Sequence, residues 1–138
     1  MFSHVTLGIS DLDRALAFYR PLTAALELEE KFNTPDIGRF WAGYVTPGTD
    51  RPIFIVTQPW NEEAPAPGNG PMVAFAVGTR AQVDEIHALA LALGGSNEGA
   101  PGLRLHYHAD YYGAYFRDPD GNKLCVVCHA PATGEAAK

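Results

Sequence analysis

Four side chains that could bind a ligand or a metal ion stand at matching points of an internal repeat. When SHVTLGIS is aligned with PMVAFAVG, His4 falls on Met72, and when PIFIVTQPW is aligned with KLCVVCHAP, Phe54 falls on Cys125. Alternate side chains of a strand point to the same face, so His4 points away from the face of Val5. The repeat therefore predicts a pseudo-twofold pocket that holds one histidine, one methionine, one phenylalanine and one cysteine.

These residue types allow more than one chemistry. His4 could be a metal ligand, a general base or a polar anchor for a substrate, or it could bond only a backbone carbonyl. Cys125 could be a soft ligand or a nucleophile, although free cysteines often act as small buried hydrophobes. Met72 and Phe54 are most simply lining residues. If a metal binds, His4, Met72 and Cys125 form a soft set that suits Cu(I).

A second cluster lies in LHYHADYYGAY, where His106 and His108 stand two residues apart among four tyrosines. In an extended segment both imidazoles share a face, and they could bind a ligand or form a polar loop edge. Arg104 could pair with a substrate carboxylate. Tyr115 and Trp41 are expected on the third strands of their halves, beside the strands that carry Cys125 and Phe54. His87, on the second helix, is expected to be surface or boundary packing.

Two similar halves are expected to position these residues, each made of a strand, a helix and further antiparallel strands. Ser10 is the expected N-cap of the first helix, and Pro21 predicts a kink or an early end. Thr79, with Gln82 as the capping-box partner, begins the second helix. The expected strands are residues 2–9, 27–33, 39–46, 53–58, 72–77, 95–98, 103–107, 113–117 and 123–129, and the expected helices are residues 12–26 and 81–93.

The domain organisation predicted from these elements is one structural domain of the α+β class. Residues 1–60 form the first βαβββ module, residues 61–71 a Pro- and Gly-rich linker, and residues 72–130 the second module. Residues 131–138 form a disordered tail. The tandem modules are expected to build one curved mixed sheet around a cavity.

Composition excludes several classes of partner. A formal net charge of −6 without a basic run argues against nucleic acid, and no apolar segment is long enough to cross a membrane. A cytoplasmic location is therefore expected. The pair Cys125 and Cys128 has a CxxC spacing, but residues three apart on a strand face opposite sides, so a disulfide or a shared metal is not expected.

The tandem βαβββ pattern, with HVTLGISDLDRALAFY near the start and YYGAYFRDPDGNKLCVV near the end, resembles the vicinal oxygen chelate superfamily over about residues 2 to 130. This group includes glyoxalase I, extradiol dioxygenases, fosfomycin-resistance enzymes and bleomycin-binding proteins. The resemblance implies a homodimer and places metal ligands at His4, Phe54, Met72 and Cys125. Histidine would usually stand at Met72 and glutamate at Cys125. Because the ligand set is incomplete, no cofactor is expected.

The resulting hypothesis is a glyoxalase-like protein that binds, and in the enzyme version transforms, a small partly aromatic or carbonyl-containing molecule in an internal cavity. A metal-independent sequestering protein of the bleomycin-resistance kind is the first alternative. A metal-dependent lyase or dioxygenase with unusual ligands is the second. The candidate catalytic residues are His4, Tyr115 and His108, and the candidate substrate-binding residues are Trp41, Phe54, Met72, Cys125, Arg104 and His106.

Overall fold

The computed structural model describes residues 1–34 and 39–132 and divides into two compact units. The first unit is Met1–Pro71 together with Pro119–Asn122, and the second is Met72–Asp118 together with the chain from Lys123 onward. The predicted linker thus belongs to the first unit. Of the predicted tail, residues 131 and 132 carry no regular structure, and the rest lies outside the described residues.

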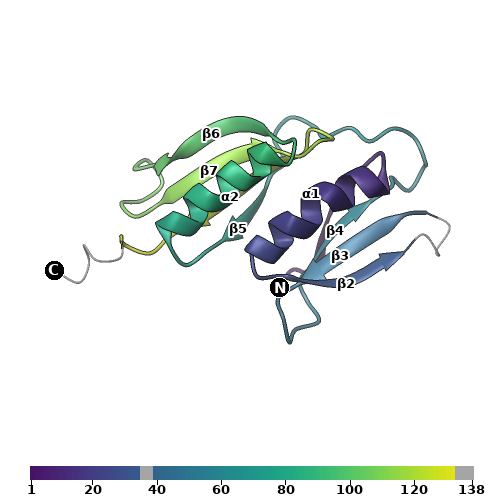
Figure 1. Ribbon diagram of the computed structural model, residues 1–138, viewed down its shortest axis with the longest axis horizontal. Coiled ribbons are helices and arrows are strands. Elements are labelled where there is room, and N and C mark those ends of the chain that lie inside the picture. Colours follow the sequence, from purple (N-terminus) through teal and green to yellow (C-terminus); the bar gives the residue numbers. More distant parts are fainter. Residues whose placement is uncertain (35–38, 133–138) are drawn as a thin grey trace. The chain divides into compact units, whose positions relative to one another are not determined.

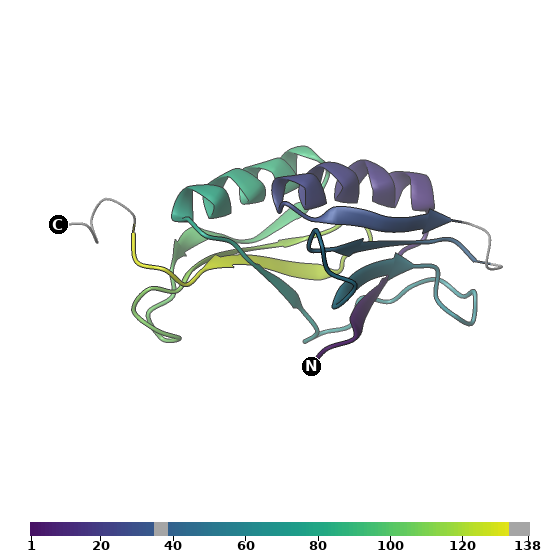
Figure 2. The same cartoon turned by 90° about the horizontal axis from the view of Figure 1, so that it is seen from below.

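Each unit has the order βαβββ, with one helix over one face of a four-stranded mixed sheet (Figure 1, Figure 2). In each sheet the first strand of the unit pairs in parallel with the last, and the remaining pairs are antiparallel. The first unit contains β1 (His4–Gly8), α1 (Leu12–Ala25), β2 (Glu29–Thr34), β3 (Trp41–Val45) and β4 (Ile53–Thr57), with the sheet order β1-β4-β3-β2. The second contains β5 (Val73–Ala76), α2 (Arg80–Ala92), β6 (Ser96–Leu103), β7 (Tyr112–Arg117) and β8 (Lys123–Cys128), with the order β5-β8-β7-β6.

The α+β class with tandem βαβββ modules is therefore confirmed, and the mixed sheet takes the form of two four-stranded sheets. One difference lies in β6, which extends the strand predicted at residues 95–98 to Leu103, while the strand predicted at residues 103–107 is not formed beyond Leu103. The strand is irregular at its Gly- and Pro-rich centre, where the register shifts between Asn97 and Gly99 and again between Gly99 and Gly102. After Leu103 the chain turns, and Tyr107 N–H donates to the Arg104 carbonyl at 3.0 Å.

The first helix differs from its prediction at both Ser10 and Pro21. Its N-cap residue is Asp11, which makes no side-chain capping bond. Ser10 does not cap because its hydroxyl donates to the Asp120 carboxylate, at 2.7 Å. The helix also continues past Pro21 to Ala25, since Leu22 is fully buried and holds the last turn against the core.

The second helix begins as predicted. The Thr79 side chain accepts from the backbone of Gln82, and the Gln82 side chain accepts from the backbone of Thr79, which together form a capping box. The expectation that His87 lies at the surface or boundary is wrong, because its side chain is buried. Its Nε2 lies 3.0 Å from Asn97 Oδ1, and its ring meets Phe116 edge-on. No helix within residues 1–34 and 39–132 is long and apolar enough to cross a membrane.

Candidate functional site

In each unit the helix covers one face of the sheet, and the opposite face, called here the helix-free face, carries most of the candidate residues. Strand pairing decides the face, because directly paired residues point the same way. In the first sheet His4 pairs with Ile53, and Val5 pairs with Phe54. The ring of Phe54 lies 5.5 Å from that of Tyr19 on α1. Phe54 therefore packs beneath the helix, and its predicted place in a pocket is wrong.

The error has a simple cause, which is an alignment of the two halves that is displaced by one residue. Val5 of β1 pairs with Phe54, whereas the equivalent Val73 of β5 pairs with Leu124. Phe54 thus corresponds to Leu124, and Cys125 corresponds to Ile55. A slip of one residue moves a side chain to the other face of a sheet.

On the helix-free face of the first unit, His4 and Trp41 lie where the alternation predicts them. His4 is exposed, and its Nδ1 lies 2.9 Å from the Ser3 hydroxyl. Trp41 packs against the cluster of Val45, Ile53 and Ile55. Its indole Nε1 is buried and has no hydrogen-bond partner among the described residues. The face is therefore apolar, with one imidazole and one unused N–H donor.

On the helix-free face of the second unit, Cys125 pairs with Tyr115 of β7 and with Ala74 of β5. Met72, just before β5, is exposed, whereas Cys125 is fully buried. Cys128 pairs with Tyr112 on the helix-covered face, so the two free thiols diverge as predicted.

A phenol pair covers the Cys125 thiol. The hydroxyls of Tyr111 and Tyr115 lie 2.9 Å apart, and the Tyr111 hydroxyl lies 3.7 Å from Cys125 Sγ. Gly113 makes this arrangement possible, because a Cβ there would stand 2.9 Å from the ring of Tyr111. The missing side chain lets the Tyr111 ring lie over β7 and bring its hydroxyl to Tyr115.

Burial keeps these groups neutral. Removal from water raises the pKa of Tyr111 most, and the hydrogen bonds to Tyr115 and Cys125 raise it further. Burial likewise raises the pKa of Tyr115 and of the Cys125 thiol. Cys125 is therefore a thiol rather than a thiolate nucleophile, and the two phenols are hydrogen-bond donors.

A pair of imidazoles lies beside the phenols. His108 Nε2 is 2.8 Å from His129 Nδ1, and the rings of both histidines meet Tyr111 edge-on. The Asp110 N–H donates to His108 Nδ1 at 3.2 Å, so the hydrogen of a neutral His108 is on Nε2 and points to His129. His106 does not share this position. Its ring lies 4.2 Å from that of Tyr107, at a tilt, in the exposed turn that replaces the predicted strand.

The second unit thus brings together Tyr115, Cys125, His108 and Arg104 of the candidate residues. His4 and Trp41 lie in the first unit. Within neither unit do three His, Cys, Asp or Glu side chains of the described residues gather as metal ligands. Copper ligation through Cys125 would require access to a thiol that is fully buried.

Sequence reasoning missed two residues of this face, Tyr111 and Lys123. Lys123 stands two positions before Cys125, so strand alternation already placed both on one face. Tyr111 precedes β7 and reaches the face only because Gly113 leaves room for its ring. No periodic pattern in the sequence predicts that the Tyr111 ring lies over Gly113.

A match to a family model supports the superfamily resemblance that the tandem βαβββ pattern suggested. The model of the Glyoxalase/Bleomycin resistance protein/Dioxygenase superfamily matches residues 1–126. The chain belongs to this superfamily. No curated protein sequence matches this superfamily member significantly.

Solved structures of the superfamily share its fold. A glyoxalase/bleomycin resistance protein from Albidiferax ferrireducens is 36% identical, with a TM-score of 0.77 over 94% of this chain and 99% of that one. A lactoylglutathione lyase from Agrobacterium tumefaciens is 24% identical, with a TM-score of 0.63 over 93% and 92%. A fosfomycin resistance protein from Listeria monocytogenes is 19% identical, with a TM-score of 0.65 over 94% and 93%. The last two likenesses show the fold alone.

Proposed function

We propose that this superfamily member binds a small planar molecule bearing a carbonyl or hydroxyl oxygen on the helix-free face of its second unit. The observation that carries the proposal is the pair of neutral phenols, Tyr111 and Tyr115, with hydroxyls 2.9 Å apart. Two phenols have two hydrogens, and their mutual bond uses one. When Tyr111 donates to Tyr115 and accepts from the Cys125 thiol, the Tyr115 hydrogen is available to a ligand oxygen.

The surroundings suit a ligand with a flat apolar part. The rings of Tyr107 and Tyr111 lie 4.7 Å apart, and Tyr107 is largely exposed. Aromatic side chains bind planar molecules through offset or edge-on contacts. The proposal needs no metal ion, since the donors are phenols and imidazoles of this unit.

The test uses matched tyrosine variants and a panel of neutral aromatic aldehydes and ketones, screened by thermal shift and then titrated by calorimetry. We expect Tyr115→Phe to weaken binding of a panel member by about 1 to 1.5 kcal/mol, the contribution of one hydrogen bond. Tyr112→Phe is the control, because its hydroxyl bonds Asp84 at 2.7 Å and its side chain lies on the helix-covered face. Equal effects of the two variants, or no binding by any panel member, would contradict the proposal.

A second candidate function is conversion of the bound carbonyl compound by proton transfer. The contact of His108 with the Tyr111 ring favours it, because an imidazole is a common general acid or base. In this version Tyr115 binds the oxygen, and His108 takes the proton at Nδ1 in place of its hydrogen bond from the Asp110 N–H. Incubation with a bound ketone in deuterated water distinguishes the two functions by NMR. Deuterium incorporation that is lost in His108→Ala supports an enzyme, and an unchanged ligand supports a sequestering protein.

Two further proposals concern the first unit and the assembly. On the helix-free face of the first unit, His4 is proposed as the polar contact for a ligand of that face, and His4→Ala should weaken binding there by about 1 kcal/mol, the contribution of one hydrogen bond. A homodimer is proposed from the superfamily resemblance, and light scattering of the purified protein tests it.

A further inference from the structure

The Arg104 guanidinium lies beside two glycines of β6, Gly99 and Gly102, whose missing side chains leave room for it. A Cβ at Gly102 would stand 3.1 Å from Arg104 Nη1, and a Cβ at Gly99 would stand 3.3 Å from Arg104 Nη2 and 3.0 Å from the Tyr115 ring. Both glycines belong to β6 and sit at its register shifts. The strand thus leaves room for a guanidinium to lie across it.

The guanidinium is held but not neutralised. Arg104 Nη2 donates to the Ala100 carbonyl at 2.8 Å, and the Arg104 backbone N–H donates to the Tyr111 carbonyl at 2.8 Å. Among residues 1–34 and 39–132, no carboxylate forms an ion pair with Arg104. A guanidinium has five donors, and most of these donors remain available.

A second cation faces the same ring. Arg104 Cζ lies 5.4 Å and Lys123 Nζ lies 5.5 Å from the centre of the Tyr115 ring. Both charges favour ionisation of the Cys125 thiol beside the ring, although burial outweighs them and its pKa is raised. The hydrogen bond and charge of Arg117 lower the pKa of Glu98 most, and the nearby charge of Lys123 lowers it further. Glu98 thus offsets part of the Lys123 charge, and Arg104 is the stronger anion-binding group.

We propose that the ligand of this face carries a carboxylate, which pairs with the Arg104 guanidinium while the flat part of the ligand lies against Tyr115. This inference rests on the proposed function and adds the charge of the ligand. A planar guanidinium fork matches a planar carboxylate through two parallel hydrogen bonds. Lys123, whose Nζ also lies near the Tyr115 ring, adds attraction without fixing the geometry.

The experiment compares benzoate, its neutral analogue benzamide and inorganic phosphate by calorimetry at low ionic strength. We expect benzoate to bind more tightly than either of the others. Arg104→Gln should weaken benzoate by about tenfold or more, and Arg104→Lys should restore only part of the loss because it lacks the fork. Benzamide affinity should change little in both variants.

Two further variants keep the test independent of folding and of net charge. Gly102→Val keeps Arg104 but fills the space beside Nη1, where even a Cβ would stand at 3.1 Å, so it should weaken benzoate and leave benzamide unchanged. Arg80→Gln is the matched control, because Arg80 stands over Tyr112 on the helix-covered face and faces Asp110 at 3.8 Å. It removes the same charge and should leave benzoate binding unaltered.

The outcomes separate this inference from the proposed function. Tyr115-dependent binding of neutral ketones, together with benzoate no tighter than benzamide, would overturn the carboxylate and leave the function standing. Phosphate bound more tightly than benzoate, or equal losses in Arg104→Gln and Arg80→Gln, would also overturn it. If neither neutral nor anionic aromatic compounds bind, the proposed function itself fails.

Discussion

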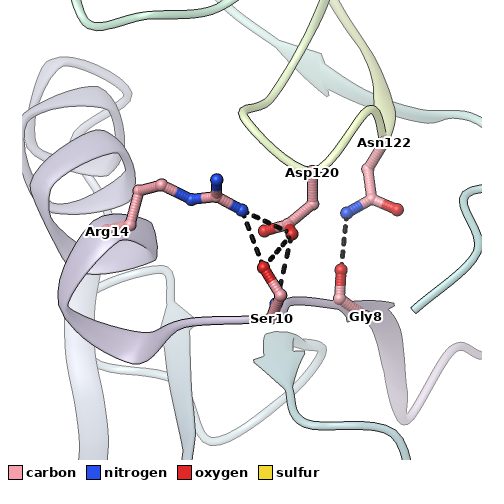
Figure 3. A network of polar contacts seen from close by, with 5 residues as sticks. All are labelled: Gly8, Ser10, Arg14, Asp120 and Asn122. Atoms are coloured by element: carbon pink, nitrogen blue, oxygen red, sulfur yellow. Dashed lines mark hydrogen bonds and ion pairs between the residues drawn. The ribbon is translucent and has the colours of Figure 1, made fainter. Parts of the chain in front are cut away.

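The turn between β7 and β8 carries a carboxylate that holds Ser10, just before α1, and Arg14 in its first turn. One oxygen of Asp120 accepts from the Ser10 backbone N–H at 3.2 Å, the Ser10 hydroxyl at 2.7 Å and the Arg14 guanidinium at 2.7 Å (Figure 3). Beside it, the Asn122 amide donates to the Gly8 carbonyl at 2.8 Å. The Asp120 side chain is only 6% exposed, whereas that of Arg14 is 48% exposed.

These contacts set the expected cost of Asp120→Ala. Two hydrogen bonds from Ser10 contribute about 1 kcal/mol each. The ion pair contributes about 0.5 to 1 kcal/mol, because water screens the half-exposed Arg14. We therefore expect a loss of about 2 to 3 kcal/mol in the free energy of unfolding. Asp120→Asn keeps an acceptor for Ser10 and should lose only about 1 kcal/mol.

Urea unfolding followed by tryptophan fluorescence measures this loss, since Trp41 and Trp60 both belong to the unit that contains Asp120. Asp50→Ala is the matched control. Asp50 forms an ion pair with Lys31 at 3.3 Å, but its side chain is 85% exposed, so its removal should cost less than about 0.5 kcal/mol. If Asp120→Ala costs no more than Asp50→Ala, the role of Asp120 in holding the start of α1 is refuted.

Three other predictions follow from burial. His87→Ala should lower the free energy of unfolding by about 1 to 3 kcal/mol, because it removes the hydrogen bond to Asn97 and leaves a gap beneath α2. A thermal melt indistinguishable from that of the parent protein would contradict this. The thiols of Cys125 and Cys128 should react with a disulfide reagent only at the rate of unfolding, so rapid labelling of the native protein would show the burial to be wrong. Because burial raises the pKa of Tyr111, the folded state retains a proton that the unfolded state loses above about pH 10, so the contribution of Tyr111 to stability should be constant below that pH and fall above it. Tyr111→Phe should reduce this alkaline loss in urea titrations.

The parts of the fold that sequence predicted are those governed by neighbouring residues. The capping box of Thr79 and Gln82 lies within one helical turn, and the structure contains it. Ser10 had the same local preference, but Asp120, 110 positions away, takes its hydroxyl. A local rule could not foresee that competition. Pro21 is similar, because the buried Leu22 stabilises a helix end that local propensity alone disfavours.

Long-range register explains the errors in the candidate site. The alternation within β1 placed His4 on the helix-free face, yet the face of Phe54 depends on which residue of β1 stands opposite it. The apolar run IFIV of β4 is buried on both faces, so its pattern does not indicate its orientation. Trp41 lies on the helix-free face because it shares a side of β3 with Gly43, which pairs with Ile55, whereas Phe54 lies on the other face.

The corrected register also changes what the repeat implies about chemistry. With Ile55 as the counterpart of Cys125, the first unit contributes apolar side chains at the place where the second unit contributes a thiol beside two phenols. The cations Arg104 and Lys123 add to this asymmetry, because the strand residue equivalent to Lys123 is Ile53. The fold is thus repeated, but the donors to a ligand oxygen are concentrated in one half. Substitutions on the second unit's helix-free face should therefore alter ligand selectivity, and those at Ile53 and Ile55 should alter mainly stability.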